Sequence, residues 1–291
     1  MIPFDMVEPA SLGEAMALLD PEDPTIRPVA GGTALMLMMK AGVFQPSRLV
    51  CLHKIEPEFA RISLGSAGEL RIGALATLRQ LEHDANVAKL FPMLKNGLGR
   101  LSNPRVRNVA RVGGALAHGD PHMDLPPMLT ALGARITIKS PRGERELPLE
   151  QLYSGYYETV LEKNELITAV TVPALAGRKA AYMKVTSRTA EDWPSLGVAV
   201  TFALEDGALR DPIVVASAAT EKVTRMTQAE RLLQGAAAED AMLKRAGDAA
   251  AEEASILSDA HGSAAYKREL LRVYLRRAVR HALGQDMRQV A

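Results

Sequence analysis

Two pairs of consecutive glycines stand about eighty residues apart in the chain, and each pair lies in a short apolar segment. The first pair is Gly31-Gly32 and the second is Gly113-Gly114. Glycine allows positive φ angles, and it lets a ligand approach the backbone because no Cβ stands in the way. Successive peptide N–H groups can then point into one concavity and bind an anion such as a diphosphate. Two such segments together could hold a dinucleotide from both sides.

The residues around each pair predict the elements that position it. Residues 27–30 are expected to form a strand that enters the first glycine segment, residues 29–34, and residues 34–39 a helix that leaves it. We interpret the second glycine segment, residues 111–115, in the same way, between a strand-like and a helix-like stretch. The first N–H groups of a helix have no intrahelical partner, so an anion can bind them. For either segment alone, a tight turn remains the alternative.

The common dinucleotide and nucleotide signatures are absent. Gly97-Leu98-Gly99 is followed by Ser102 at the position where the dinucleotide-binding fingerprint needs a third glycine. The dipeptide Gly-Lys, which a phosphate-binding P-loop requires, does not occur in the sequence. If the glycine segments bind a nucleotide, they do so in another fold.

Four side chains that can bind metals or hydroxyl groups follow the second glycine segment: His118, Asp120, His122 and Asp124. A metal site is one interpretation, but Gly119 and Pro121 disfavour the helix that would bring these ligands to one face. The interpretation we prefer is that Asp124, beside a nucleotide loop, bonds a ribose or ribityl hydroxyl. We therefore expect no metal site.

Three arginines and one tryptophan have two interpretations each. Arg105, Arg107 and Arg111 lie close to the second glycine segment, where they form a solvated face or contact an anion. Trp193, the only tryptophan, stands in a polar loop, where it packs internally or covers a flat aromatic ring. No nucleophile motif emerges, so any redox chemistry would come from a cofactor.

The composition limits the class of protein. Of the 291 residues, 47% are hydrophobic and 24% are charged, as in a soluble globular protein. Lys and Arg number 35 against 34 Asp and Glu, and only 4% of residues are aromatic, so nucleic acid is not an expected partner. The single cysteine, Cys51, excludes a cysteine-ligated iron–sulfur cluster within this chain. We see no signal peptide or membrane-spanning segment, and we expect a cytoplasmic location.

The pattern of elements changes near Pro173. Before it, short strands alternate with helices, including helices expected over residues 78–84 and 90–101 and a strand over residues 135–139. After it, three strands precede an alanine-rich helical region that starts near Gln228. We therefore expect a strand-rich α/β domain followed by a smaller domain of sheet and helices.

These motifs together resemble one known family, the FAD-binding medium subunits of molybdenum hydroxylases. That family includes the carbon monoxide dehydrogenase medium chain and the flavin domain of xanthine dehydrogenase. The resemblance covers nearly the whole chain. It rests on Ala30-Gly31-Gly32-Thr33, Met38-Met39-Lys40, Arg107-Asn108, Gly113-Gly114, Ala117-His118, Asp120-Pro121, Asp124-Leu125-Pro126, Glu165-Leu166-Ile167, Val172-Pro173, Lys184-Val185, Arg188, Asp192 and Ser263-Ala264-Ala265-Tyr266-Lys267-Arg268.

The resemblance implies an α+β fold. A vanillyl-alcohol-oxidase (PCMH)-type FAD-binding domain would span residues 1–175, with two α/β subdomains over 1–57 and 58–175. A small C-terminal α/β domain, a short sheet with helices, would span residues 176–291.

The resemblance also implies the residues that bind the cofactor. The two glycine segments would hold the FAD pyrophosphate, and Asp124 a cofactor hydroxyl. Leu101 would pack near the adenine, Ile167 and Lys184 would lie towards the flavin ring, and Trp193 would cover it. The full set is Val29, Ala30, Gly31, Gly32, Thr33, Ala34, Leu101, Arg111, Val112, Gly113, Gly114, Ala115, Asp124, Ile167, Lys184 and Trp193.

As a function, the resemblance implies a subunit with non-covalent FAD that takes electrons from a 2Fe–2S subunit and passes them to an external acceptor. A large partner subunit would carry molybdopterin and a small one the 2Fe–2S clusters, assembled as a dimer of heterotrimers. Arg111 and Ala115 depart from the family, which usually has Thr or Ser and Asn or Ser there. Two alternatives stay open: a standalone flavin oxidoreductase of the same fold, and a non-catalytic assembly subunit that has lost FAD.

Overall fold

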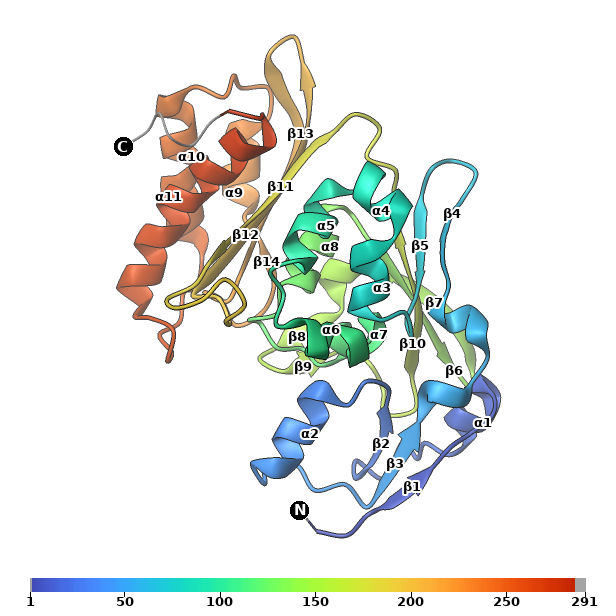
Figure 1. The fold of residues 1–291 in the computed structure, drawn as a ribbon. Coiled ribbons are helices and arrows are strands. Elements are labelled where there is room, and N and C mark those ends of the chain that lie inside the picture. Colours follow the sequence, from blue (N-terminus) through green and yellow to red (C-terminus); the bar gives the residue numbers. More distant parts are fainter. Residues whose placement is uncertain (1, 286–291) are drawn as a thin grey trace.

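Three main sheets follow one another along the chain, and helices pack against each of them (Figure 1). The computed structural model describes residues 2–285. We call the part from β1 to β3 the N-terminal unit, the part from β4 to β10 the middle unit, and the part from β11 to α11 the C-terminal unit. No helix among the described residues is both long and apolar enough to cross a membrane.

The N-terminal unit is a parallel sheet of order β1-β3-β2, because helices separate its strands along the chain. Its helix α2 leads directly out of the first glycine segment. The elements are β1 (Asp5–Val7), α1 (Leu12–Ala17), β2 (Ile26–Val29), α2 (Thr33–Lys40) and β3 (Arg48–Cys51), followed by short 3₁₀ helices over Leu52–Lys54 and Pro57–Ala60.

The middle unit is an antiparallel sheet of order β4-β5-β10-β6-β7, packed against a group of short helices. Its strands are β4 (Ile62–Leu64), β5 (Leu70–Gly73), β6 (Arg135–Ser140), β7 (Gly143–Pro148) and β10 (Leu166–Val172), with a small hairpin of β8 (Tyr153–Gly155) and β9 (Glu158–Thr159). Its helices are α3 (Leu78–His83), α4 (Ala85–Leu90), α5 (Pro92–Leu98), α6 (Pro104–Val109), α7 (Val112–Ala117), α8 (Leu125–Ala131) and a 3₁₀ turn over Leu149–Gln151.

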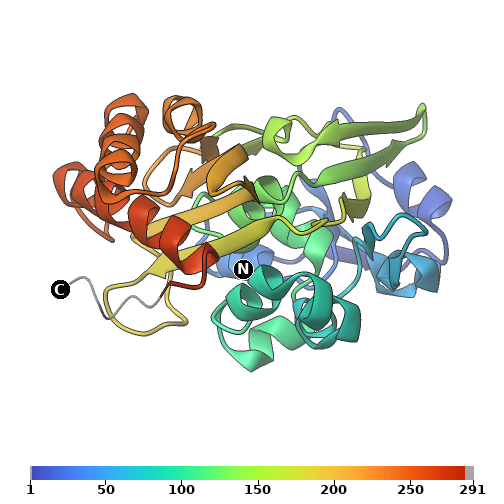
Figure 2. The same cartoon turned by 90° about the horizontal axis from the view of Figure 1, so that it is seen from above.

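The C-terminal unit is an antiparallel sheet of order β11-β12-β13-β14 with helices on both faces (Figures 1 and 2). Its own helices α9, α10 and α11 cover one face, and α5 and α8 of the middle unit pack against the other. The elements are β11 (Lys179–Val185), β12 (Leu196–Glu205), β13 (Ala208–Ser217), β14 (Thr224–Arg225), α9 (Thr227–Leu233), α10 (Asp240–Glu253) and α11 (Ala264–Ala282).

Each unit has its own cluster of buried apolar side chains, and a few residues cross between clusters. Leu166 of the middle unit packs in the N-terminal core, and Ala199 and Val215 of the C-terminal unit pack in the middle core. The predicted domain boundaries at residues 57 and 175 stay predictions.

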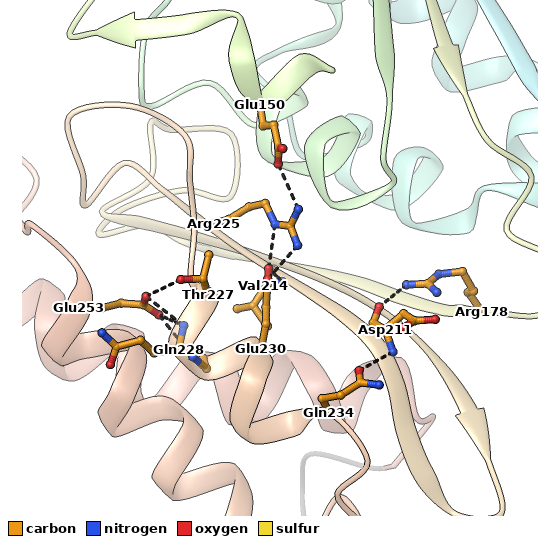
Figure 3. A network of polar contacts seen from close by, with 11 residues as sticks. Glu150, Arg178, Asp211, Val214, Arg225, Thr227, Gln228, Glu230, Gln234 and Glu253 are labelled. Atoms are coloured by element: carbon orange, nitrogen blue, oxygen red, sulfur yellow. Dashed lines mark hydrogen bonds and ion pairs between the residues drawn. The ribbon is translucent and has the colours of Figure 1, made fainter. Parts of the chain in front are cut away.

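Polar contacts also join the middle and C-terminal units (Figure 3). Arg225 of β14 lies 3.3 Å from the carboxylate of Glu150 in the middle unit and donates at 2.8 Å to Glu230 in α9. The Glu230 carboxylate also accepts the N–H of Val214 at 2.9 Å, so it links helix α9 to β13. This network links the edge strand β14 of the C-terminal unit to the 3₁₀ turn over Leu149–Gln151 of the middle unit.

Two predicted elements were wrong in detail. The helix expected over residues 90–101 is shorter: α5 begins at Pro92, which has no N–H, and ends at Leu98, whereas α4, whose start Asp84 caps, was not expected. The strand-like stretch expected before the second glycine segment is helix α6. Asn103 caps this helix by accepting the Val106 N–H at 3.1 Å, and Pro104 occupies its first position.

Candidate functional site

The two glycine segments meet in the structure. A Cβ on Gly31 would lie 2.3 Å from the carbonyl oxygen of Val109 and 2.8 Å from Cα of Ala110, directly before the second segment. Such distances are shorter than any real contact, so only glycine lets the two backbones touch. The predicted convergence of the segments is confirmed.

The first glycine segment leaves its N–H groups unbonded. Strand β2 ends at Val29, and Gly32 caps α2 with a left-handed φ of 68° and no side-chain cap. Among the described residues, none accepts a hydrogen bond from the N–H groups of residues 31–35. A set of free donors at the start of an eight-residue helix is a suitable binding site for an anion.

The second glycine segment is built differently, because its glycines lie inside α7. The N–H of Val112 donates to the carbonyl of Ala76 at 3.0 Å, and that of Gly113 donates to the carbonyl of Ala74 at 2.7 Å. Of this segment's glycines, only Gly114 has no partner for its N–H within the part of the chain that the structure describes. A Cβ on Gly114 would meet no heavy atom within 4 Å, so open space lies in front of it.

The arginines near the second segment have separate roles. Arg111 is half-buried and donates through Nη1 to the carbonyl of Leu75 at 2.8 Å; burial lowers its pKa from the ordinary value. Arg107 is buried, and its Nε lies 2.9 Å from the carboxylate of Glu82. Neither interpretation, a solvated face or contact with an anion, therefore applies to this arginine. It also donates to the carbonyl of Leu101, whose side chain is buried in the middle core.

Asp124 joins two units through a buried cluster. Tyr182 donates to its Oδ1 at 2.6 Å, and Lys184 donates to its Oδ2 at 2.8 Å. Tyr182 and Lys184 are alternate residues of β11, so they share one face of the strand. Burial raises the pKa of Asp124 and the Lys184 ammonium opposes that rise. Both carboxylate oxygens therefore hold the lysine and tyrosine, and the predicted bond from Asp124 to a cofactor hydroxyl stays a prediction.

Lys184 is fixed on two sides. Its Nζ also donates to the carbonyl of Arg100 at 3.1 Å, and its side chain is only 3% exposed. Ile167 is half-buried at an irregularity of strand β10, where the pairing with β6 shifts. The contacts of Lys184, Ile167 and Leu101 with the cofactor stay predictions.

Trp193 stands in the connection between β11 and β12 and is 53% exposed. Its ring centroid lies 6.1 Å from that of His122 at an interplanar angle of 21°, and 6.1 Å from that of His261. An exposed indole supported from behind by other rings has a free face for a flat ligand. The predicted cover of the flavin ring by Trp193 is compatible with this position and stays a prediction.

The segment that suggested a metal site forms a hydrogen-bonded cluster instead. Nδ1 of His122 lies 3.2 Å from Asp120, and its Nε2 lies 2.8 Å from Asp259, which is 137 positions away in the chain. Among residues 2–285 no group of three or more His, Cys, Asp or Glu side chains could hold a metal ion. The local sequence pattern could not reveal Asp259 as a partner, because only the tertiary fold brings it there.

Comparisons with known proteins match the chain to two consecutive families. The family described as "FAD binding domain in molybdopterin dehydrogenase" matches residues 2–175. The family described as "CO dehydrogenase flavoprotein C-terminal domain" matches residues 181–282.

Curated relatives are similar over almost their whole length. The chain is 32% identical to the carbon monoxide dehydrogenase medium chain of Hydrogenophaga pseudoflava, over 97% of this chain and 98% of the relative. It is 30% identical to the glyceraldehyde dehydrogenase medium chain of Sulfolobus acidocaldarius, over 94% of this chain and 96% of the relative.

Solved structures are similar at the level of the fold. A carbon monoxide dehydrogenase from Hydrogenophaga pseudoflava, which lacks the Mo-pyranopterin moiety, superposes with a TM-score of 0.93 at 32% identity, covering 98% of this chain and 99% of the other. Quinoline 2-oxidoreductase from Pseudomonas putida 86 superposes with a TM-score of 0.90 at 29% identity, covering 97% and 98%. The chain belongs to the family of FAD-binding subunits of molybdenum hydroxylases, an α+β flavoprotein domain followed by the family's C-terminal domain.

Proposed function

We propose that this chain carries FAD as the electron-transfer subunit of a heteromeric molybdenum hydroxylase. It would take electrons from a 2Fe–2S subunit and pass them to an external acceptor. A large molybdopterin subunit and a small iron–sulfur subunit would complete the complex, as a dimer of heterotrimers. The observation that supports this proposal best is the contact between the two glycine segments, whose unbonded N–H groups could donate to an anion.

The residues present fit the diphosphate of FAD. The N–H groups of residues 31–35 and of Gly114 are free to donate, and Gly114 has open space in front of its Cα. A hydrogen bond to a charged group contributes about 1.5–3 kcal/mol, so several of them support tight non-covalent binding. This fit argues against loss of FAD, although Arg111 and Ala115 replace side chains that usually bond the cofactor in the family.

Bound FAD would supply the electron-transfer chemistry, which no side chain of this protein provides. The chain's own contribution is to bind and orient. Lys184, fixed by Asp124 and the carbonyl of Arg100, would hold a positive charge near the flavin ring. Trp193 would limit water at the exposed ring face.

A 2Fe–2S cluster that supplies the electrons would lie on another polypeptide. Cys51 is the only cysteine, it is buried, and burial raises the pKa of its thiol. One thiol cannot ligate a 2Fe–2S cluster, which needs four protein ligands. This division of chemistry supports a relay subunit over a self-contained enzyme.

The experiment is purification of the tagged chain from its native source, followed by visible spectroscopy and metal analysis. We expect flavin absorption together with iron, molybdenum and two further polypeptides in fixed proportion. A yellow chain that elutes alone and turns over a small organic donor would overturn the relay role in favour of a standalone enzyme. A colourless chain that still carries both partners would identify an assembly subunit.

The direction of electron flow needs a second measurement on the same complex. After anaerobic reduction with dithionite and removal of excess reductant, the flavin absorption should return when NAD, oxygen or a quinone is added. The acceptor that restores it fastest is the physiological class. If the iron–sulfur absorption recovers with all three acceptors while the flavin stays bleached, electrons do not leave through this chain.

A further inference from the structure

Three aromatic rings meet where the middle and C-terminal units join. The ring of His122 lies 5.1 Å from that of His261, and each of these imidazoles lies 6.1 Å from the indole of Trp193. We call these three residues the His122 cluster. His122 is 6% exposed, whereas Trp193 is 53% exposed, so the histidine lies behind the indole as its inner support.

His122 has a carboxylate on each of its ring nitrogens. Asp120, from its own loop, faces Nδ1, and Asp259, from the turn before α11, faces Nε2. A ring that donates from both nitrogens is an imidazolium. Burial disfavours this charge, but the two carboxylates outweigh burial and raise the pKa of His122 above its ordinary value.

The carboxylates are fixed in their turn. Lys267, completely buried in α11, donates to Asp259 at 2.5 Å and to the carbonyl of Ala218 at 2.7 Å. Burial opposes ionisation of Asp259, but Lys267 and His122 lower the pKa of this carboxyl to about 2. Asp120 is likewise held ionised by His122 against the effect of burial, which keeps its pKa below the usual value.

The other titratable groups around the cluster are few. His118 and Tyr157 pack against each other beside Asp120, and Tyr156 packs on Tyr157. Burial lowers the pKa of His118 and raises that of Tyr157, so both stay neutral near pH 7. Of the two histidines of this segment, His118 is therefore neutral and His122 carries the charge.

The loop that carries Trp193 has one further tie to the same turn. Ser195 donates through Oγ to the carbonyl of His261 at 2.7 Å, and its N–H donates to Val185 at 2.8 Å. These bonds fix the end of the loop, two residues beyond the indole. The indole itself lies against the two imidazoles, so its position depends on them.

We propose that His122 is a positioning residue for the flavin: as an imidazolium held between Asp120 and Asp259, it supports Trp193 in the position that covers the ring. This inference rests on the proposed function, which puts the flavin under Trp193. Loss of the proton breaks one of the two bonds that hold the imidazole, since a neutral ring has a single N–H. The cover then loosens and FAD leaves faster.

The sign of the pH dependence follows from the direction of the shift. The pKa of His122 is raised above 6.5, so the support is present at pH 6 and is lost as pH rises through the folded-state pKa. FAD should therefore dissociate more slowly at pH 6 than at pH 9.

The only tryptophan of the chain provides a readout that is independent of turnover. In the full-length chain freed of FAD, an imidazolium next to the indole quenches its emission, so the emission of Trp193 should rise as His122 loses its proton. We expect a midpoint above pH 6.5. A midpoint at or below that value, or no change, would contradict the charged state of His122.

Two variants assign the titration to one ring. His122→Gln should abolish the pH-dependent emission change, and it should weaken FAD binding at pH 6 by about threefold to tenfold, which corresponds to one aromatic contact. His261→Gln is the matched control, because it removes the neighbouring imidazole and leaves His122 between its carboxylates. It should keep the titration with its midpoint above pH 6.5.

A third variant keeps the test decisive if His122→Gln fails to fold. Asp120→Asn removes one carboxylate charge but keeps an oxygen for the backbone N–H of His122, so the midpoint should move down towards 6.5. An unchanged midpoint would overturn the proposal.

FAD addition separates this proposal from the one on which it rests. If FAD leaves the emission of Trp193 unchanged, the flavin does not lie under the indole, and that part of the proposed function fails. If FAD quenches Trp193 but His122→Gln releases FAD at the wild-type rate at pH 6, only the positioning role of His122 fails.

Discussion

The two glycine segments share a dipeptide and are built in opposite ways. In the first, a strand ends, Gly32 takes a left-handed φ of 68°, and the N–H groups of residues 31–35 stay unbonded. In the second, the glycines lie in the first turn of α7, and the N–H groups of Val112 and Gly113 donate to the connection after β5. Most of the unbonded N–H groups therefore lie in the first segment.

The difference arises from what surrounds each segment. The second segment packs on the chain between β5 and α3, where Gly113 allows the backbone to approach Ala74 and Ala110 accepts the N–H of Leu78. The first segment contacts residues 109–110 at Gly31, and its own N–H groups stay unbonded. The same dipeptide therefore meets different needs: Gly31 allows the two segments to touch, Gly113 allows internal packing, and Gly114 leaves open space in front of its Cα.

The change Gly31→Ala should have the largest effect. Its Cβ would lie 2.3 Å from a backbone oxygen that cannot move without displacing α6, so the two segments must separate. We expect FAD binding to be lost and the free energy of unfolding to fall by about 1–3 kcal/mol, as for other overpacked sites. Urea unfolding and flavin content of the purified variant measure both effects.

The control for this change is Gly13→Ala, in helix α1. Gly13 is exposed, and a Cβ there meets only the hydroxyl of Ser11 at 3.9 Å. It should bind FAD as the wild type does. If Gly31→Ala also keeps its flavin, contact between the segments is not needed for binding.

The change Gly113→Ala should affect stability first. Its Cβ would lie 2.7 Å from that of Ala74, and the 2.7 Å hydrogen bond to the Ala74 carbonyl would have to lengthen. We expect a loss of about 1–3 kcal/mol in the free energy of unfolding. Flavin bound per folded molecule, measured at a temperature well below the unfolding transition, should fall less than in Gly31→Ala. Equal losses would mean that both segments serve the ligand in the same way.

The local part of this comparison could be predicted from the sequence, and the tertiary part could not. The strand and helix around the first segment follow from apolar periodicity, and β2 and α2 lie within a residue or two of the predicted bounds. The convergence of the segments was inferred from their composition and the family resemblance. The use of the Val112 and Gly113 N–H groups depends on carbonyls of Ala76 and Ala74, which no local pattern marks as acceptors.

The charged partners that lie far away in the sequence could not be predicted either. The segment from His118 to Asp124 suggested hydroxyl binding or a metal, but His122 pairs with Asp259 and Asp124 with Lys184, each from the C-terminal unit. Two histidines and two carboxylates close in sequence fit several kinds of site, and only the packing of the units distinguishes them. Helix α4, which was not predicted, had a local signal by contrast, because Asp84 caps its start by accepting the N–H groups of Asn86 and Val87.

The change Gly114→Ala should separate ligand binding from stability. A Cβ there meets nothing within 4 Å, and Ala has a better helix propensity than Gly, so the free energy of unfolding should stay equal or rise by up to about 1 kcal/mol. The methyl group would occupy the open space in front of residue 114 and shield its N–H, the only unbonded glycine N–H of the second segment among the described residues. We expect FAD affinity to fall about tenfold or more. Fluorescence titration with FAD and urea unfolding on the same preparation measure both. Unchanged affinity would show that the diphosphate does not reach α7.

The change Arg111→Gln should have the smallest effect, and it tests whether charge replaces the hydroxyl that the family usually has at this position. The guanidinium gives one N–H to the carbonyl of Leu75, so its loss should cost about 1 kcal/mol of stability. The remaining N–H groups of this half-buried cation can face the diphosphate, and we expect FAD affinity to fall about threefold in low salt and less in high salt. Arg105→Gln, on the exposed side of α6, is the matched control because it removes the same charge close by in the chain. If both variants lose affinity equally and with the same salt dependence, Arg111 acts only through the long-range attraction between its positive charge and FAD, without a direct contact. If Arg111→Gln alone weakens binding, the second segment contributes a side chain as well as the N–H of Gly114, and its difference from the first segment is one of chemistry and not only of backbone geometry.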